Sequence, residues 1–201
     1  MREGTMQQTM QVLVSKATVE WYTPPDYSDL VRAVLGTIDL DPASSALPQT
    51  WIQARRWYGL DLSQFIVDPT WTPEQLRVAL RRESRRQLAM QPAWAGRVFL
   101  NSPFDDTPLW ATRLAYEVAS GATTEAIQLC NSNLGYVWYE ALWRRCVVCC
   151  VEERIRFVRA DGTQGAASKQ GQTFAYYGPR PDVFARVFRT VGRIVRPEDA
   201  A

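Results

Sequence analysis

The turn at positions 101–104 carries side chains suited to binding a nucleobase. Asn101-Ser102-Pro103-Phe104 directly follows the apolar run 98–100. An asparagine beside a proline-restricted turn offers an amide oxygen and backbone carbonyls as hydrogen-bond acceptors, and the neighbouring aromatic ring offers a stacking face. Acceptors that hold an exocyclic amine while a ring stacks on the base fit a flipped-out base. The same residues also fit an ordinary Asn-x-Pro turn with Phe104 anchored in the core.

Two further turns combine proline with polar side chains. They are Trp21-x-Thr23-Pro24 and, at the end of the strand expected at 37–40, Asp39-x-Asp41-Pro42-Ala43. An acidic residue at the carboxyl end of a first strand can hold the ribose or the amino acid portion of a nucleoside cofactor. The chain has no GxGxxG, so a dinucleotide fingerprint is absent. Taken singly, the Asp41-Pro42 turn is also typical of a helix cap.

Strand and helix patterns alternate along the chain and would position these turns. We expect strands at 37–40, 97–100, 126–130, 146–151, 154–158 and 173–177, and helices at 26–35, 51–58, 73–90, 107–118, 133–143 and 181–191. Such alternation predicts an α/β fold with a mostly parallel sheet and helices on both faces. A Gly-rich loop, not a helix, joins the strands 154–158 and 173–177, which indicates an antiparallel end to that sheet.

Composition bounds the class of protein. The chain has 201 residues, 46% of them hydrophobic and 22% charged, which is typical of a globular domain. We expect one domain over residues 19–196 after a polar lead-in, 1–18. Histidine is absent, which excludes Ser-His-Asp and Cys-His nucleophiles and His-containing zinc sites. The chain has neither a long apolar run nor a charged-then-apolar leader, so we expect a cytoplasmic protein that does not enter membranes.

The four cysteines allow a metal interpretation and a core interpretation. Cys146-x-x-Cys149, with Cys130 and Cys150, supplies enough thiolates for zinc. In an extended strand, however, positions three apart point to opposite faces, and no turn residue lies between them. The unbroken apolar run therefore favours a strand buried on both faces, in which a free cysteine packs as a small hydrophobe and no metal is held.

Arginine is concentrated in a helical insertion at about 63–92. The helix expected at 73–90 carries Arg77, Arg81, Arg82, Arg85 and Arg86, while the whole chain has two lysines, Lys16 and Lys169. One interpretation is a solvated helix face, the usual meaning of a run of charges. The other is a surface that contacts nucleic-acid phosphates, with Lys169 as a further contact.

In combination and in this order, the motifs resemble the phage-type DNA adenine N-6 methyltransferases, a Dam-like family. That family has a Trp-x-Thr-Pro segment, then an Asp-Pro-Ala or Asp-Ala-Ala turn, then an Asn-Pro-Pro-Tyr/Phe turn. Three later features are similar too: Trp138, Arg154-Ile155-Arg156-Phe157 and the run 171–178. In all, the resemblance covers about residues 19–192. Ordered co-occurrence is more specific than any single motif.

The resemblance implies a Rossmann-like methyltransferase fold, S-adenosylmethionine as cofactor and double-stranded DNA as partner. It places the target amine at Asn101 and the Ser102 carbonyl, with Pro103 shaping the turn and Phe104 stacking on the flipped adenine. The cofactor pocket it implies is formed by Trp21, Thr23, Pro24, Asp39, Asp41, Pro42 and Ala43.

One residue departs from the family pattern, because Ser102 stands where the family has its first proline. The backbone carbonyl survives that change, but the turn is less rigid, and a misplacement of about 1 Å can cost about a hundredfold in rate. Two alternatives therefore stay open. One is a methyltransferase-fold module without turnover that binds DNA or a host or phage protein, and the other is a methyltransferase acting on RNA or a small molecule.

Overall fold

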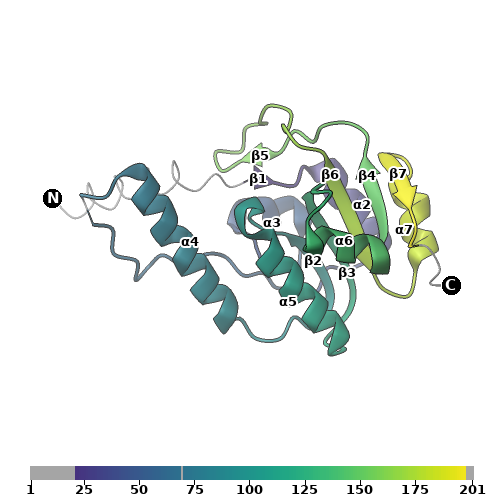
Figure 1. Cartoon of the computed structure of the whole chain (residues 1–201), viewed down its shortest axis with the longest axis horizontal. Coiled ribbons are helices and arrows are strands. Elements are labelled where there is room, and N and C mark those ends of the chain that lie inside the picture. Colours follow the sequence, from purple (N-terminus) through teal and green to yellow (C-terminus); the bar gives the residue numbers. More distant parts are fainter. Residues whose placement is uncertain (1–20, 69, 198–201) are drawn as a thin grey trace.

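The computed structural model describes residues 21–68 and 70–197, so the predicted lead-in 1–18 lies outside the described residues. A five-stranded sheet forms the centre (Figure 1). Its spatial order is β2 (Gly96–Asn101), β3 (Thr123–Asn131), β6 (Gln172–Tyr177), β4 (Val147–Val151) and β7 (Gly192–Val195).

The sheet is mixed. β2 and β3 are parallel, whereas β6 runs antiparallel to both its neighbours, β3 and β4, and β7 is antiparallel to β4. The predicted α/β class with helices on both faces is confirmed. The prediction of a mostly parallel sheet is wrong, because β2–β3 is the one parallel pair of this sheet and the antiparallel strand β6 lies inside it, where the sequence pattern placed an antiparallel end. The strand β7 was not predicted, because Gly192 reads as a helix terminator.

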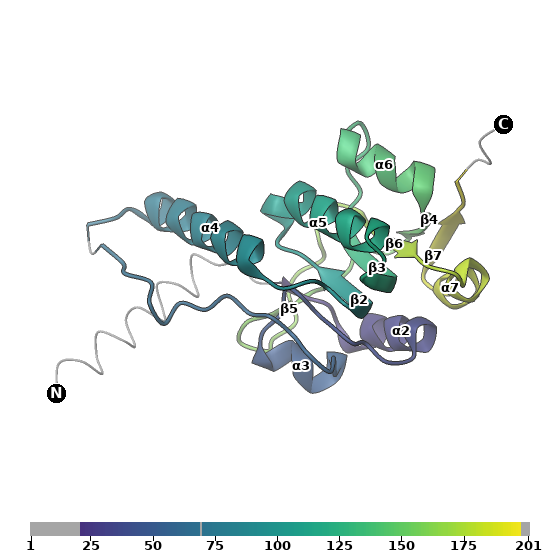
Figure 2. The same cartoon turned by 90° about the horizontal axis from the view of Figure 1, so that it is seen from below.

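Helices cover both faces of the sheet (Figure 2). α5 (Thr107–Ala119) and α6 (Val137–Arg145) lie on one face, and α2 (Pro25–Leu35) and α7 (Pro181–Phe188) lie on the other. Alternation along β2 explains this: Val98 and Leu100 enter the cluster under α5, while Phe99 enters the cluster under α2 and α7. Burial on both faces is why this strand is continuously apolar.

Residues 37–60 differ from the sequence-based expectation. Segment 37–40 forms one isolated bridge, Leu40 to Val98, and not a full strand. The next helix is α3 (Ala46–Ile52), which ends earlier than the predicted 51–58 because Gln53 adopts a left-handed backbone, φ 58°. Residues after it run extended beside Asp41, whose backbone bonds to Arg56 and Tyr58. Tertiary pairing here overrides the local helical pattern.

The predicted strand 154–158 is also shorter than expected. β5 comprises Val158–Arg159 and pairs antiparallel with β1, Trp21–Tyr22, in a separate two-stranded sheet. Similarly, α6 begins at Val137, not at the predicted Asn133 cap. In both cases the alternating or capping pattern is present in the sequence, but the regular backbone hydrogen bonds of the strand or helix begin a few residues later than predicted.

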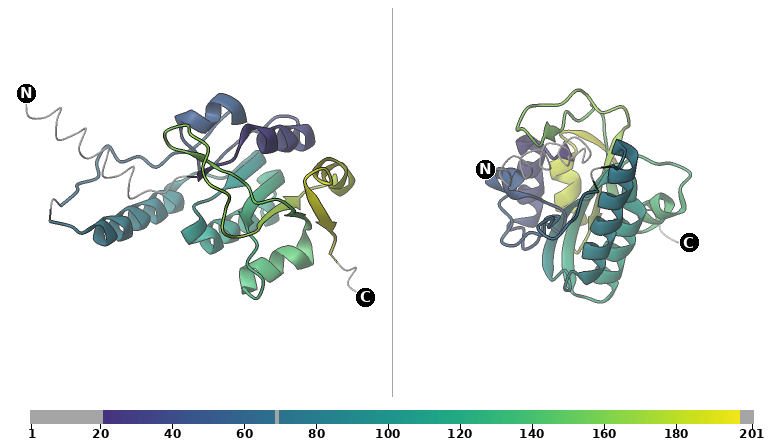
Figure 3. Two further views of the ribbon diagram at one scale, coloured as in Figure 1. Left: turned by 90° about the horizontal axis from the view of Figure 1, so that it is seen from above. Right: turned by 90° about the vertical axis from the view of Figure 1, so that its left-hand side faces the viewer.

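The Arg-rich segment forms the helix predicted for it, α4 (Pro73–Met90). A capping box starts this helix: Thr72 accepts from the Gln75 backbone N–H, and the Gln75 side chain accepts from the Thr72 N–H. α4 stands at one end of the molecule, away from α2 and α7 (Figure 3). Within the described ranges, no helix combines the length and apolar character needed to cross a membrane.

Candidate functional site

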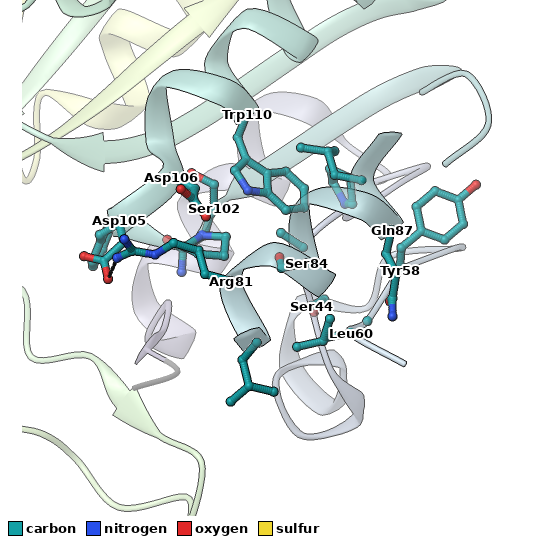
Figure 4. Close-up of a pocket in the computed structure, with 18 of the residues that line it drawn as sticks. Ser44, Tyr58, Leu60, Arg81, Ser84, Gln87, Ser102, Asp105, Asp106 and Trp110 are labelled. Atoms are coloured by element: carbon teal, nitrogen blue, oxygen red, sulfur yellow. Dashed lines mark hydrogen bonds and ion pairs between the residues drawn. The ribbon is translucent and has the colours of Figure 1, made fainter. Parts of the chain in front are cut away.

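The three turns singled out in the sequence meet at one cavity of about 390 Å³. Trp21 and Tyr22, Pro42 and Ala43, and the stretch 101–106 all line it, although they lie far apart along the chain. Figure 4 shows Ser102 and Asp106 on one side of this pocket and Tyr58 and Gln87 on the other. A cavity of this size lies within the range of about 300–1,000 Å³ that is typical of small-molecule sites.

Asn101 ends β2 and lines this pocket, and one hydrogen bond fixes the orientation of its amide. Its Nδ2 donates to the backbone carbonyl of Trp21 at 2.9 Å. Its Oδ1 is buried and has no hydrogen-bond partner among the described residues. Because an unpaired buried acceptor costs about 1–3 kcal/mol, such an atom is a candidate for binding a ligand donor.

The rest of the turn is tightly held. Ser102 is 3% exposed, and its hydroxyl also has no partner within the described residues. The Asp106 N–H donates to the Pro103 carbonyl at 3.1 Å. Phe104 lines the pocket while its ring makes an edge contact with Phe157, with ring centroids 5.4 Å apart. The ring is therefore both anchored on the core and exposed to the cavity.

One face of α4 forms the opposite wall of the pocket. The helical spacing of three and four residues brings these side chains to the same face. They are Arg77, Leu80, Arg81, Ser84, Gln87 and Leu88, and the C-cap residue Gln91 extends the wall. The sequence pattern did not indicate this role for Ser84, Gln87 and Gln91, nor did it indicate Tyr58 and Trp110 as pocket residues. Polar residues repeat along the helix at a spacing of three and four, which indicates a polar face. The sequence does not indicate that this face of the helix lines a pocket.

The α4 arginines are bound mainly to carboxylates. Arg81 pairs with Asp105, and Arg85 pairs with the buried Asp106 through Nη2 and Nε at 2.6 and 3.1 Å. The hydrogen bonds that Arg85 donates to the Asp106 carboxylate raise the pKa of Arg85. Arg77 pairs with Glu74 and Arg86 with Glu83. Among the described residues Arg82 has no ion-pair partner, and Lys169 is exposed in the loop before β6.

The two acids predicted to bind the cofactor lie outside the pocket lining. Asp41 is buried and accepts from Gln49 Nε2 at 2.8 Å and from the Ala43 N–H at 3.3 Å. Burial raises the pKa of Asp41 to about 6, against the lowering effect of hydrogen bonds from Ser44, Ala43 and Gln49. Its carboxyl group thus fixes the loop that presents Pro42 and Ala43.

Asp39 is likewise occupied by the protein. Its Oδ2 accepts from the Arg97 N–H at 2.9 Å and from Arg97 Nε at 3.1 Å, and Arg55 lies 3.4 Å from Oδ1. Burial acts to raise the pKa of Asp39, but the hydrogen bonds from Arg97 outweigh it, so the pKa is lowered. This residue joins segment 37–41 to β2, which is a structural role.

Thr23 and Pro24 also lie outside the lining of the pocket. The Thr23 carbonyl accepts from the Trp51 indole N–H at 2.9 Å, and Pro24 is the N-cap of α2. The Thr23 hydroxyl is buried and has no partner within the described part of the chain. Of the seven residues predicted to bind the cofactor, Trp21, Pro42 and Ala43 face the cavity.

The cysteines pack in the core beside β3 and β4. Cys130, Cys146 and Cys149 are buried, and Cys150 is half-buried. Burial raises the pKa of Cys146 and of Cys149 to about 12, which disfavours the thiolates that zinc requires. In the described ranges, no three His, Cys, Asp or Glu side chains are grouped so as to hold a metal ion.

In comparisons with known proteins, the chain matches solved structures alone. No protein-family model matches the chain, and no curated protein matches it. Six chains of solved structures match. One is a dimethyladenosine transferase from Plasmodium falciparum, with 10% sequence identity and a TM-score of 0.42. The match covers 82% of this chain and 65% of that protein, so this chain spans less than two thirds of its length. Membership of the phage-type family stays a prediction.

Proposed function

We propose that this chain is an S-adenosylmethionine-dependent methyltransferase that modifies the exocyclic amine of adenine in DNA, with the pocket beside Asn101 as its active site. The observation that carries the proposal is the buried Oδ1 of Asn101, which is oriented by the bond from Nδ2 to Trp21 and has no partner among the described residues. An amine N–H is the donor that would satisfy this atom.

The residues of the pocket fit the proposed cofactor. Adenosine needs flat apolar surfaces with a few hydrogen-bonding groups, and the lining offers the rings of Trp21, Tyr22 and Tyr58 together with Ser44 and Gln87. Pro42 and Ala43 complete that wall. When bound, S-adenosylmethionine supplies an electrophilic methyl group on a sulfonium.

The chain's own contribution is positioning. Asn101 Oδ1, with the carbonyl of Ser102, accepts hydrogen bonds from the adenine amine and directs the nitrogen lone pair toward the methyl carbon. A cofactor held against Trp21, Pro42 and Ala43 would supply the methyl group to this nitrogen, and the proton that the amine loses would pass to water. Phe104 supplies a ring face for the base. Such alignment of reacting atoms and charges accounts for rate without a covalent enzyme intermediate.

DNA as the substrate rests on the ordered resemblance of the motifs. A module that binds without turnover is a second candidate, and Ser102 in place of the family's proline favours it. Both questions are answered by one assay, because transfer and binding are measured on the same oligonucleotides.

The assay measures transfer of a labelled methyl group from S-adenosylmethionine to duplex DNA, to the same duplex without adenine, and to RNA of equal sequence. We expect adenine-dependent labelling of DNA, and a loss of about 10²–10³-fold in kcat for Asn101→Ala, as for removal of one oriented hydrogen-bonding group elsewhere. Asn133→Ala serves as control, since Asn133 is partly exposed outside the pocket.

Three outcomes would contradict the proposal. Labelling of RNA with none of DNA would overturn the substrate. Equal activity of wild type and Asn101→Ala would remove Asn101 from the site. Cofactor and DNA binding with no transfer would establish the binding module instead.

A further inference from the structure

A basic segment contacts two residues that line the pocket, Trp21 and Phe104. Residues 154–170, here called the basic strap, contain four cations, Arg154, Arg156, Arg159 and Lys169, and one carboxylate, Asp161. All four cations are exposed. In the described part of the chain, none of the four forms an ion pair. Asp161 accepts from Thr163, and Arg159 contributes to lowering its pKa.

The cations are presented by an anchored backbone. Ile155 and Phe157 are 1% and 3% exposed and enter the main core cluster, while Arg154 and Arg156 between them face outward. Successive side chains of an extended segment point in opposite directions, so burying the apolar pair forces the two arginines to the surface. The charges are therefore held in place on a fixed backbone.

This anchoring connects the strap to two residues of the pocket. Phe157 contacts the ring of Phe104, and Arg159 pairs through its backbone with Trp21 in the β5–β1 ladder (Figure 1). Gly165 packs so closely on the indole of Trp21 that a Cβ there would lie 2.5 Å from a ring carbon. Both Phe104 and Trp21 line the cavity.

The helix α4 offers far less free positive charge, although it holds more arginines. Arg77, Arg81, Arg85 and Arg86 are paired with Glu74, Asp105, Asp106 and Glu83, which leaves Arg82. The four carboxylates offset the charge of these arginines, so a phosphate at α4 would meet a surface of lower net positive charge. Just before the strap, Glu152 is paired with Arg193, and Glu153 is exposed.

We infer that the basic strap, and not α4, is the surface that binds the phosphate backbone of the DNA duplex whose adenine enters the pocket. The inference rests on the proposed function for the identity of the duplex, and on charge and position for the surface. Arginine binds phosphate oxygens through paired N–H groups, and lysine binds them as a point charge. Arg154, Arg156 and Lys169 would be the principal contacts.

The test measures binding of a fluorescein-labelled, adenine-containing duplex by anisotropy at several salt concentrations, without cofactor. The strap variant is Arg154→Ala/Arg156→Ala/Lys169→Ala. Its matched control is Arg144→Ala/Arg186→Ala/Arg189→Ala, which removes three exposed cations. Arg144 lies on α6, Arg186 lies on α7, and Arg189 is the C-cap residue of α7. A third protein is Arg82→Ala, and thermal unfolding checks that each variant is folded.

A plot of the logarithm of the association constant against the logarithm of the salt concentration has a negative slope. Each lost phosphate contact makes this slope shallower by about 0.9. We therefore expect the strap variant to lose about 2.7 in slope and about a hundredfold in affinity at 0.1 M salt. The matched control and Arg82→Ala should keep the wild-type slope. An unchanged slope in the strap variant, an equal loss in the matched control, or no DNA binding by the wild type would overturn the inference.

The methyl-transfer assay on the same proteins separates this inference from the proposed function. Loss of salt-dependent binding in the strap variant, with no transfer by the wild type, supports the surface and refutes the enzyme. Transfer by the wild type, with binding unaffected by the strap substitutions, supports the enzyme and refutes the surface.

Discussion

Arg85 of α4 holds the buried carboxylate of Asp106 through two of its nitrogens, at 2.6 and 3.1 Å. Asp106 in turn bonds through its N–H to Pro103 and is the N-cap residue of α5. One ion pair thus connects the wall of the pocket to the turn that carries Asn101. This gives the arginines of α4 a structural role within the site.

Arg85→Ala should weaken both the fold and the proposed reaction. The carboxylate of Asp106 is 4% exposed and would lose charge-assisted hydrogen bonds, while the arginine itself is 55% exposed, which reduces the net loss. We expect the free energy of unfolding, measured in urea titrations, to fall by more than it does for Arg82→Ala. Methyl transfer should slow mainly in kcat, because alignment is disturbed, and Arg85→Lys should recover part of it.

Arg82→Ala is the matched control for Arg85→Ala, since Arg82 is exposed on the same helix without an ion pair among the described residues. It should change the free energy of unfolding by less than about 0.5 kcal/mol. Equal effects at the two positions would show that the pair with Asp106 contributes nothing specific.

Ser102→Pro should stabilise the turn. The buried hydroxyl of Ser102 has no partner among the described residues, so its removal relieves a cost, and a proline also restricts the unfolded chain. We expect the free energy of unfolding to rise by about 1 kcal/mol, measured by denaturant unfolding. Ser102→Ala removes the hydroxyl alone and separates the two effects.

A higher kcat for Ser102→Pro than for the wild type would show that flexibility of the turn limits the rate. A lower Tm would show that the backbone at position 102 does not tolerate proline.

Asp41 should make stability depend on pH in the direction opposite to that of most acids. Its folded-state pKa is about 6, above the unfolded value of 3.8, so the folded protein binds more protons between those values. The stabilisation due to this group is present below about pH 4 and is lost as pH rises through 6. A difference of about two units corresponds to about 3 kcal/mol.

The measurement for Asp41 compares urea unfolding of the wild type and Asp41→Asn from pH 4 to pH 7. The wild type should lose up to about 3 kcal/mol relative to the variant over this range. A constant difference between the two proteins would mean that the carboxyl group is ionised throughout.

The cysteines should be unreactive in the native protein. Burial raises the pKa of the Cys130 thiol, and it raises those of Cys146 and Cys149 to about 12. Since the thiolate is the reactive form, a chromogenic disulfide reagent at pH 8 should label these three only on unfolding, with half-buried Cys150 reacting first. Adding EDTA should leave Tm unchanged. A Tm lowered by chelation would instead indicate a structural metal.

The local sequence pattern was sufficient to predict the helices and strands that have strong apolar periodicity or a proline at their start. The apolar runs of β2, β3, β4 and β6, and Pro73 and Pro108 at helix starts, predicted these elements with boundaries shifted by a few residues. The prediction for residues 37–60 was wrong because their conformation depends on partners remote in sequence, such as Arg97 for Asp39. Short segments of this kind take their structure from tertiary hydrogen bonds, which no local pattern records.

The amino-acid sequence by itself determined which turns have the chemistry for a nucleobase site, and it placed Asn101, Ser102 and Phe104 at a strand end. Only the tertiary structure decided which side chains remain available at that site. Asp39, Asp41 and four arginines of α4 are committed to partners within the protein, whereas Asn101 Oδ1 and the cations of the basic strap are not, among the residues described. The reason is physical: a charged or polar group is satisfied by whatever donor or acceptor folding brings near it, and that pairing is set by packing between distant segments.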